Sequence, residues 1–259
     1  MIGIFDSGIG GMSVLKEIHK LLPVQSYSYY ADSAYCPYGE KSPEFIIQRA
    51  KEITRTLLND GSEIIVIACN TATAAAVATL RKDFPDIRFI GMEPAVKPAA
   101  EKTKTGIIGI LATAGTLKGE KYHNIKDRYA HDVKVVEHVG EGFVELVEAN
   151  ISSAAVSESE TEEIVRRSIS PLINAGADHI VLGCTHYPFL EPTIKKVASE
   201  LSPERDITIV NPAPAVAKHL LEVMQKEGIE PLDNRAHIVR SSDPERLNPA
   251  QNLFNTIVG

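Results

Sequence analysis

The stretch HIVLGCTHYPFL, residues 179–190, contains the local pattern from which the fold is predicted. Four apolar or small residues, ending at Gly183, are followed at once by Cys184, Thr185 and His186. A short apolar run that ends in a small residue and a polar turn is typical of a buried strand that leads into a helix. Open parallel sheets bind ligands at the carboxyl ends of their strands. The stretch therefore predicts a βα unit with a thiol, a hydroxyl and an imidazole where a ligand would bind.

Such units recur along the whole chain. Short apolar segments alternate with longer amphipathic ones, which predicts an α/β protein with largely parallel sheets. The expected strands are residues 2–6, 27–31, 63–68, 88–91, 105–111, 133–137, 179–182 and 208–210. The expected helices are residues 12–22, 43–59, 73–84, 115–129, 143–149, 158–175, 189–201 and 213–227.

Two pairs of these units resemble each other. IGIFDSGIGGMSVL (2–15) is similar to IIGILATAGTLKGE (107–120), and IIVIACNTATAAAV (64–77) is similar to HIVLGCTHYPFLEP (179–192). Chance similarity between βα units is one explanation, and duplication of a whole lobe is the other. A duplication would give two similar α/β lobes, each with a cysteine at the carboxyl end of a strand.

Composition limits the classes of partner. The chain has 259 residues, a formal charge of −7 and an isoelectric point near 5.7, with no block of Lys or Arg. These values argue against nucleic acid or an anionic membrane as the main partner and favour a small soluble ligand. The N-terminus does not look like a signal peptide, and the longest uncharged run, 64–80, is interrupted by polar residues. We therefore expect a cytoplasmic protein.

The glycine-rich turn at residues 8–11 has two possible uses. A dinucleotide-binding turn would need a third glycine where Ser13 stands, and no acidic residue clearly ends the next strand. The alternative is a tight turn whose backbone N–H groups, at a helix N-terminus, bind the carboxylate of a ligand. Asp6 and Ser7 would then add polar side chains at the same place.

The three cysteines are too few for a disulfide framework, and none lies in a CxxC pair. Cys36 fits a small buried hydrophobic residue, although a loop sequence follows it. Cys69 and Cys184 each lie between an expected strand and an expected helix, followed by hydrogen-bonding side chains at 70–71 and 185–186. A thiol at a helix N-terminus loses its proton more easily, because the helix dipole and the free N–H groups favour the thiolate.

Three kinds of chemistry could use these thiols. Cys69 with Cys184 and His186 is a poor match to the spacings of zinc ligands. A cysteine hydrolase would need one thiol and one histidine base, and would leave the second cysteine turn unexplained. A pair of thiols facing each other across a ligand could remove a proton from carbon on one side and return one on the other. That third option inverts a stereocentre without a cofactor and uses both cysteines.

Four segments of the chain resemble signature segments of the glutamate racemases. They are GIFDSGIGG (3–11), YYADSAYCPYGEKS (29–42), IACNTATAAA (67–76) and VLGCTHYPFL (181–190), which occur in the family order and at the family spacing. The resemblance implies interconversion of L- and D-glutamate without a cofactor or metal, with the D-isomer supplied for peptidoglycan. It further implies two pseudo-symmetric α/β lobes with the active site in the cleft between them, and a homodimer.

The resemblance also implies roles for particular residues. Cys69 would take the α-proton from D-glutamate and Cys184 would take it from L-glutamate. Asp6 and His186 would assist proton transfer near their respective cysteines. Substrate contacts would fall on Asp6, Ser7, Tyr38, Gly39, Asn70, Thr71, Thr185 and His186.

One further catalytic position falls in a segment that departs from the family pattern. Relatives often carry Cys-Pro ahead of the FVxLVE segment, and this chain has Glu141-Gly142 there. A glutamate that assists the second half-site would fall on Glu148, with a solvent-facing helical glutamate as the alternative.

The resemblance and the repeat together predict where the lobes divide. The first lobe would comprise residues 1–96 and 208–259 and carry Cys69, and the second would comprise residues 97–207 and carry Cys184. Aspartate racemases share the two-thiol design but typically read Cys-Thr-Glu at the second motif, so glutamate is the favoured substrate. Two further functions compete with racemisation: an amino-acid-binding module with inert thiols, and a thiol-dependent amide hydrolase.

Overall fold

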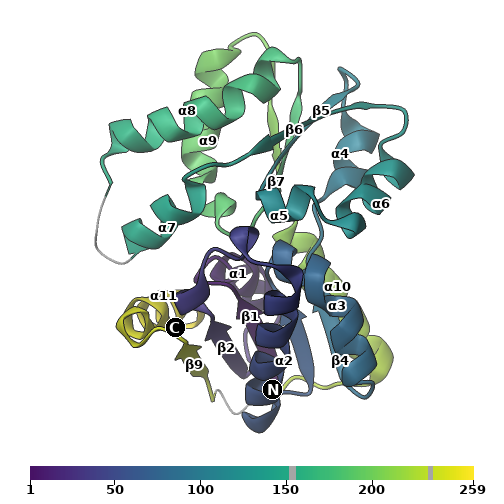
Figure 1. Ribbon diagram of the computed structural model, residues 1–259, viewed down its shortest axis with the longest axis vertical. Helices are drawn as coiled ribbons and strands as arrows, with labels where there is room; N and C mark the ends of the chain where they lie inside the picture. The colour runs from purple at the N-terminus through teal and green to yellow at the C-terminus, as the bar shows by residue number, and fades with distance from the viewer. Residues whose placement is uncertain (152–155, 233–235) are drawn as a thin grey trace. The chain divides into compact units, whose positions relative to one another are not determined.

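The computed structural model describes residues 1–151, 156–232 and 236–259 (Figure 1). It has two sheets of parallel strands flanked by helices, which confirms the predicted α/β class. The chain divides into two compact units. Unit 1 comprises Met1–Met92 and Ala213–Gly259, and unit 2 comprises Glu93–Pro212. No helix in the described part of the chain has the length and apolar character needed to cross a membrane.

Unit 1 is built on a five-stranded sheet in the order β4-β3-β1-β2-β9. Its strands are β1 (Ile2–Asp6), β2 (Tyr27–Ala31), β3 (Ile64–Ile67), β4 (Arg88–Gly91) and β9 (Ile238–Ser241). Its helices are α1 (Met12–Leu21), α2 (Pro43–Asn59), α3 (Asn70–Asp83), α10 (Ala213–Glu227) and α11 (Leu247–Val258).

The central strands of unit 1 are apolar along their whole length because helices cover both faces of the sheet. Phe5, Ile65 and Ile67 pack in one core cluster with residues of α2 and α3. The alternate residues Ile4 and Val66 point to the opposite face and are also fully buried. Continuous apolar runs of this kind are typical of strands buried on both sides.

Unit 2 is built on a four-stranded sheet in the order β6-β5-β7-β8. Its strands are β5 (Ile107–Ala112), β6 (Lys134–Val139), β7 (His179–Gly183) and β8 (Thr208–Val210). Its helices are α4 (Val96–Lys102), α5 (Ala114–Leu117), α6 (Glu120–Tyr129), α7 (Phe143–Ile151), α8 (Glu158–Asn174) and α9 (Glu191–Leu201).

The two sheets share one topology. In unit 1 the order β2-β1-β3-β4 places the first strand between the second and third, with the fourth beyond the third. Unit 2 repeats this order as β6-β5-β7-β8, and β9 is an additional edge strand of unit 1. Cys69 follows the third strand of one sheet and Cys184 the third strand of the other. The internal sequence similarity thus coincides with equivalent positions in two like-connected sheets.

Several elements differ from the sequence-based expectation. The helix expected at residues 115–129 is two helices, α5 and α6, because the backbone is extended at Gly119. The helix expected at 73–84 begins at Asn70, and the one expected at 189–201 begins at Glu191, after a 3-10 helix at Tyr187–Leu190. The additional elements α4, β9 and α11 were not expected.

Candidate active site

Cys69 immediately precedes the first residue of α3, and Ala68 alone separates it from the end of β3. Its backbone is extended, as an N-cap residue requires, and its sulfur accepts a hydrogen bond from the Ala72 N–H at 3.4 Å. The thiol thus occupies the position that a serine or aspartate side chain usually takes at a helix N-terminus. The free N–H groups and the positive end of the helix dipole stabilise negative charge there.

Polar side chains surround this thiol within unit 1. The Oγ of Ser7 lies 3.9 Å from the Cys69 sulfur. Asn70 is 4% exposed, and neither its amide nitrogen nor its amide oxygen has a hydrogen-bond partner among the described residues. A buried amide without a partner costs about 1–3 kcal/mol. Asn70 therefore has the donor and acceptor capacity that a bound polar ligand would satisfy.

Asp6 ends β1 and is fully buried. Its Oδ2 accepts hydrogen bonds from the backbone N–H of Gly8 at 3.2 Å and of Gly11 at 3.0 Å. A Cβ at Gly11 would come within 2.7 Å of Asp6 Cβ and of the Tyr29 hydroxyl, so only glycine fits this turn. The expectation that the amides of the glycine-rich turn bind a ligand carboxylate is thus wrong for Gly8 and Gly11, since Asp6 already occupies them.

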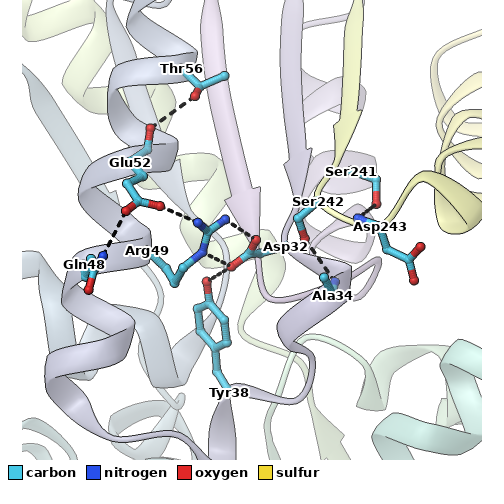
Figure 2. A network of polar contacts seen from close by, with 10 residues as sticks. All are labelled: Asp32, Ala34, Tyr38, Gln48, Arg49, Glu52, Thr56, Ser241, Ser242 and Asp243. Atoms are coloured by element: carbon cyan, nitrogen blue, oxygen red, sulfur yellow. Dashed lines mark hydrogen bonds and ion pairs between the residues drawn. The ribbon is translucent and has the colours of Figure 1, made fainter.

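Tyr38 and Gly39 lie in the 3-10 helix Tyr38–Glu40, in the loop after β2. The Tyr38 ring is buried in the same core cluster as Cys69, and its hydroxyl donates to Asp32 Oδ2 at 2.5 Å (Figure 2). Burial, followed by the negative charge of Asp32, raises the pKa of Tyr38 far above its usual value. The Tyr38 hydroxyl is therefore a committed donor to Asp32.

Cys184 follows β7 directly and is buried. Cys184 itself lies in a bend, and a turn and the 3-10 helix Tyr187–Leu190 follow it, so the thiol does not cap an α-helix as the sequence pattern predicted. The polar neighbour of this thiol is instead the imidazole of His186, whose Nδ1 lies 3.8 Å from the Cys184 sulfur. The Thr185 hydroxyl lies 3.5 Å from the same nitrogen.

Glu148 lies on the buried face of α7, and its Oε1 is 2.8 Å from His186 Nε2. Both side chains are almost fully buried, so the carboxylate and the imidazole are each other's polar neighbours in a low-dielectric setting. The alternative of a solvent-facing glutamate is wrong. In unit 2 the structure thus assembles a chain of contacts from Glu148 through His186 to Cys184.

Three residues near the thiols carried no assignment from the sequence. Asp32 and Arg49 form an ion pair that holds Tyr38, and Tyr187 packs fully buried beside Cys184. Asp32 and Tyr187 lie inside the signature segments 29–42 and 181–190, so the resemblance could have pointed to them. Arg49 lies outside all four segments, and nothing in its neighbouring sequence indicates a role at the site. Cys36, expected as a core residue, is instead half-exposed in the loop.

The chain is similar to known proteins along most of its length. The family model described as Asp/Glu/Hydantoin racemase matches residues 2–220. A glutamate racemase of Roseiflexus sp. is 43% identical over 95% of this chain and 89% of its own length. A glutamate racemase of Ectopseudomonas mendocina is 45% identical over 86% of this chain and 81% of its own.

Solved structures extend the similarity to the fold. The crystal structure of Escherichia coli glutamate racemase, in complex with L-glutamate and the activator UDP-MurNAc-ala, matches with a TM-score of 0.85. It is 32% identical and covers 99% of this chain and 94% of that one. With the family model spanning most of the sequence and the racemase fold present, this chain belongs to the Asp/Glu/Hydantoin racemase family.

Proposed function

We propose that this protein interconverts L- and D-glutamate without a cofactor and so supplies D-glutamate for peptidoglycan. The observation that carries the proposal is the pair of thiols at equivalent strand ends of two like-connected sheets. Relatives over 40% identical along most of the chain are glutamate racemases. A hydrolase or a binding module would leave one of the two cysteine turns without a use.

The proposed reaction is a two-base proton transfer at Cα. With D-glutamate, the Cys69 thiolate takes the α-proton, and the Cys184 thiol returns a proton to the opposite face of the carbanion. With L-glutamate the two thiols exchange roles. The proposal requires the two thiols to act on opposite faces of one bound substrate. Each turnover leaves the proton count of the enzyme unchanged, with one cysteine newly protonated and the other newly ionised.

The carbanion must be stabilised by donors to the substrate carboxylate, because no imine absorbs its charge. The unpartnered amide of Asn70 and the hydroxyls of Ser7, Thr71 and Thr185 are the side-chain donors beside the thiols that we assign to substrate binding. The backbone at residues 38–39 completes this set.

Asp6, His186 and Glu148 act on the proton transfers in this proposal. Asp6 holds the turn next to Cys69 through Gly8 and Gly11. His186 contacts the Cys184 sulfur, and Glu148 orients the imidazole from its other nitrogen. Proton transfer would thus be assisted by a carboxylate beside Cys69 and by a histidine–glutamate pair beside Cys184.

Incubation with each glutamate enantiomer in D₂O tests this function. The wild-type protein is expected to place deuterium at Cα, seen by loss of the Cα–H signal in proton NMR, and to bring the optical rotation to zero. Cys69→Ser and Cys184→Ser should each slow racemisation by about 10²–10⁴-fold, because a serine hydroxyl is a far weaker acid than a thiol.

The same experiment assigns each thiol to a face of the substrate. Cys184→Ser retains Cys69 and should still exchange the α-proton of D-glutamate faster than that of L-glutamate, while it racemises either enantiomer only at the slowed rate. Cys69→Ser should show the opposite preference. Near-wild-type racemisation by either variant would refute the two-thiol mechanism. L-Aspartate, shorter by one methylene, should react about 10–200-fold more slowly than L-glutamate.

We also propose that the protein is a cytoplasmic homodimer. The family resemblance supports both parts of this proposal, and Leu21, Val24 and Leu232 are exposed apolar side chains of unit 1 that a dimer contact could cover. Sedimentation equilibrium should give twice the chain mass of 28.2 kDa. A single-chain mass at micromolar concentration would rule the homodimer out.

A further inference from the structure

Asp32 is a fully buried carboxylate immediately after β2. Its backbone N–H donates to the carbonyl of Asp6 at 3.0 Å, so it stands beside the strand end that carries a candidate site residue. A charge buried this deeply is tolerated only with matching partners. Asp32 therefore has to be compensated by the groups around it.

Arg49 of α2 provides the compensating charge (Figure 2). Its Nε donates to Asp32 Oδ2 at 3.0 Å and its Nη2 to Asp32 Oδ1 at 2.7 Å, a bidentate pair. The guanidinium also lies over the Tyr35 ring, 4.7 Å from its centroid. Glu52, one turn further along α2, pairs with Arg49 from the solvent side.

The same Asp32 oxygen accepts the Tyr38 hydroxyl. Asp32 thereby joins α2 to the 3-10 helix Tyr38–Glu40, whose tyrosine ring packs in the core cluster that contains Cys69. The start of this loop has one further tie, from the Ala34 N–H to the Ser242 hydroxyl at 3.0 Å. The loop between β2 and α2 is thus held by polar contacts from outside its own sequence.

We propose that Asp32 is a positioning residue: clamped by Arg49, it fixes Tyr38 and with it the backbone of residues 38–39 where glutamate binds. This role rests on the proposed function, because it presumes that residues 38–39 contact the substrate. Asp32 itself touches neither the thiols nor the ligand. Its effect on the reaction passes through the tyrosine hydroxyl.

Unit 1 contains a second ion pair with the same chemistry but away from the thiols. Arg240 of β9 donates from Nε to Asp60 Oδ2 at 2.9 Å and from Nη2 to Asp60 Oδ1 at 2.5 Å. Asp60 follows the C-terminal end of α2, and its other partner is the Ser28 hydroxyl near the start of β2. Asp60→Asn is therefore the matched control for Asp32→Asn.

Steady-state kinetics of glutamate racemisation and hydrogen–deuterium exchange of peptides covering residues 33–41 test the proposal. Asp32→Asn should raise KM about tenfold while kcat changes less than about threefold, because binding contacts are lost rather than the proton carriers. Exchange of the loop amides should become several-fold faster in the same variant. Asp60→Asn should lower thermal stability but leave KM and loop exchange at wild-type values.

Tyr38→Phe keeps the ring and removes only the hydroxyl, so it should reproduce the KM and exchange effects of Asp32→Asn. If Asp32→Asn does not fold, KM and loop exchange of Tyr38→Phe alone test whether Asp32 fixes Tyr38. Unchanged KM and unchanged loop exchange in Tyr38→Phe or Asp32→Asn would overturn the proposal. Equal effects of Asp32→Asn and Asp60→Asn on both readouts would overturn it too.

The proposed function and this inference can fail separately. If the wild-type protein does not racemise glutamate, the function fails. The exchange comparison needs no substrate and still supports or overturns the fixing of the turn by Asp32. If the wild-type protein is active and the variants match it, only the positioning role fails.

Discussion

Cys69 and Cys184 hold equivalent positions in their sheets but have different neighbours. The Cys69 sulfur accepts an N–H at the start of α3, where the helix itself stabilises negative charge. Cys184 precedes a 3-10 helix and has the His186 imidazole beside it instead. Glu148 supports that imidazole from the far side. The thiol of unit 1 therefore has a helix N-terminus beside it, and the thiol of unit 2 has a histidine–glutamate pair.

Replacing Glu148 by glutamine tests this difference. Glutamine retains the size of the side chain but removes the negative charge that orients His186. We expect kcat to fall about ten- to hundredfold, with KM within about threefold, because the change affects proton transfer at Cys184 rather than substrate contacts. Circular dichroism of the glutamate solution follows the reaction from either enantiomer.

Glu145→Gln provides the control for Glu148→Gln. Glu145 lies on the exposed side of the same helix and should tolerate the change with unaltered kcat. If both glutamine variants had the same kcat, a positioning role of Glu148 would be excluded.

At the level of elements, one carboxylate links the segments that precede β5 and β7 in unit 2. Asp178 stands just before β7 and accepts hydrogen bonds from Thr103 Oγ1 at 2.6 Å, Lys104 N at 2.6 Å and Thr105 N at 3.0 Å. The Nδ1 of His179 lies 2.9 Å from Asp178 Oδ1, the oxygen that also accepts the Thr103 hydroxyl. The connection from α4 to β5 is thereby tied to β7, at the end of the sheet opposite to the thiol.

Asp178→Asn is expected to destabilise unit 2 in a pH-dependent way. Burial by itself would raise the pKa of Asp178, but the hydrogen bonds outweigh it and hold the pKa well below its usual value. A depressed pKa means that the stabilisation is present above the ordinary pKa of about 3.9 and is lost as the pH falls below it. At pH 7 the variant should lose about 2 kcal/mol of unfolding free energy.

Urea denaturation between pH 7 and pH 3 measures this effect. The difference between wild-type protein and Asp178→Asn should shrink as the pH falls below about 4. Asp132→Asn, at a carboxylate of the same unit that is 88% exposed and whose one ion pair among the described residues is with the exposed His131, should match the wild-type protein throughout. A difference that stays constant with pH would show that the Asp178 charge is not the source.

The elements that the sequence did not predict are short or weakly patterned. Ile238–Ser241 is a four-residue edge strand with the charged Arg240 in it, so it lacks the apolar run of a central strand. Leu247–Val258 and Val96–Lys102 each carry a proline in the first turn and few buried positions. The elements that were predicted have a clear apolar pattern, either a continuous run in a strand buried on both faces or a helical repeat in a helix buried on one face.

At the scale of the whole molecule, unit 1 is completed only by the C-terminal part of the chain. After unit 2 the chain returns, α10 and α11 pack against α1, and β9 adds to the sheet edge beside β2. Aromatic side chains fill this junction. The His237 ring stacks on buried Tyr27 at 5.7 Å and meets Phe254 of α11 edge-on at 5.3 Å, while His19 of α1 lies 6.0 Å from Tyr27.

This junction should make unit 1 sensitive to mild acid. Burial lowers the pKa of His19, and burial together with His19 lowers that of His237. The folded state therefore binds fewer protons than the unfolded state. The stabilisation is complete above the ordinary histidine pKa of about 6.5 and is lost as the pH falls below it.

His237→Phe should reduce this sensitivity, because phenylalanine can still stack on Tyr27 but cannot bind a proton. The thermal midpoint of the wild-type protein should fall between pH 7.5 and pH 5.5, and it should fall less in the variant. His131→Phe, at a histidine with 66% side-chain exposure, should behave like the wild-type protein. Equal acid sensitivity of all three proteins would contradict the role given to His237.

The sequence by itself determined the α/β class, the central strands and the positions of Cys69 and Cys184 at strand ends. These are local properties, since apolar runs and turn residues report burial and chain direction without reference to distant segments. Only the tertiary structure decided which partner each buried carboxylate has. Asp6 binds the amides of its own turn, Asp32 pairs with Arg49, and Glu148 meets a histidine 38 residues away in the chain. Buried charges are compensated by whatever packing brings opposite them, and sequence spacing does not encode that neighbour.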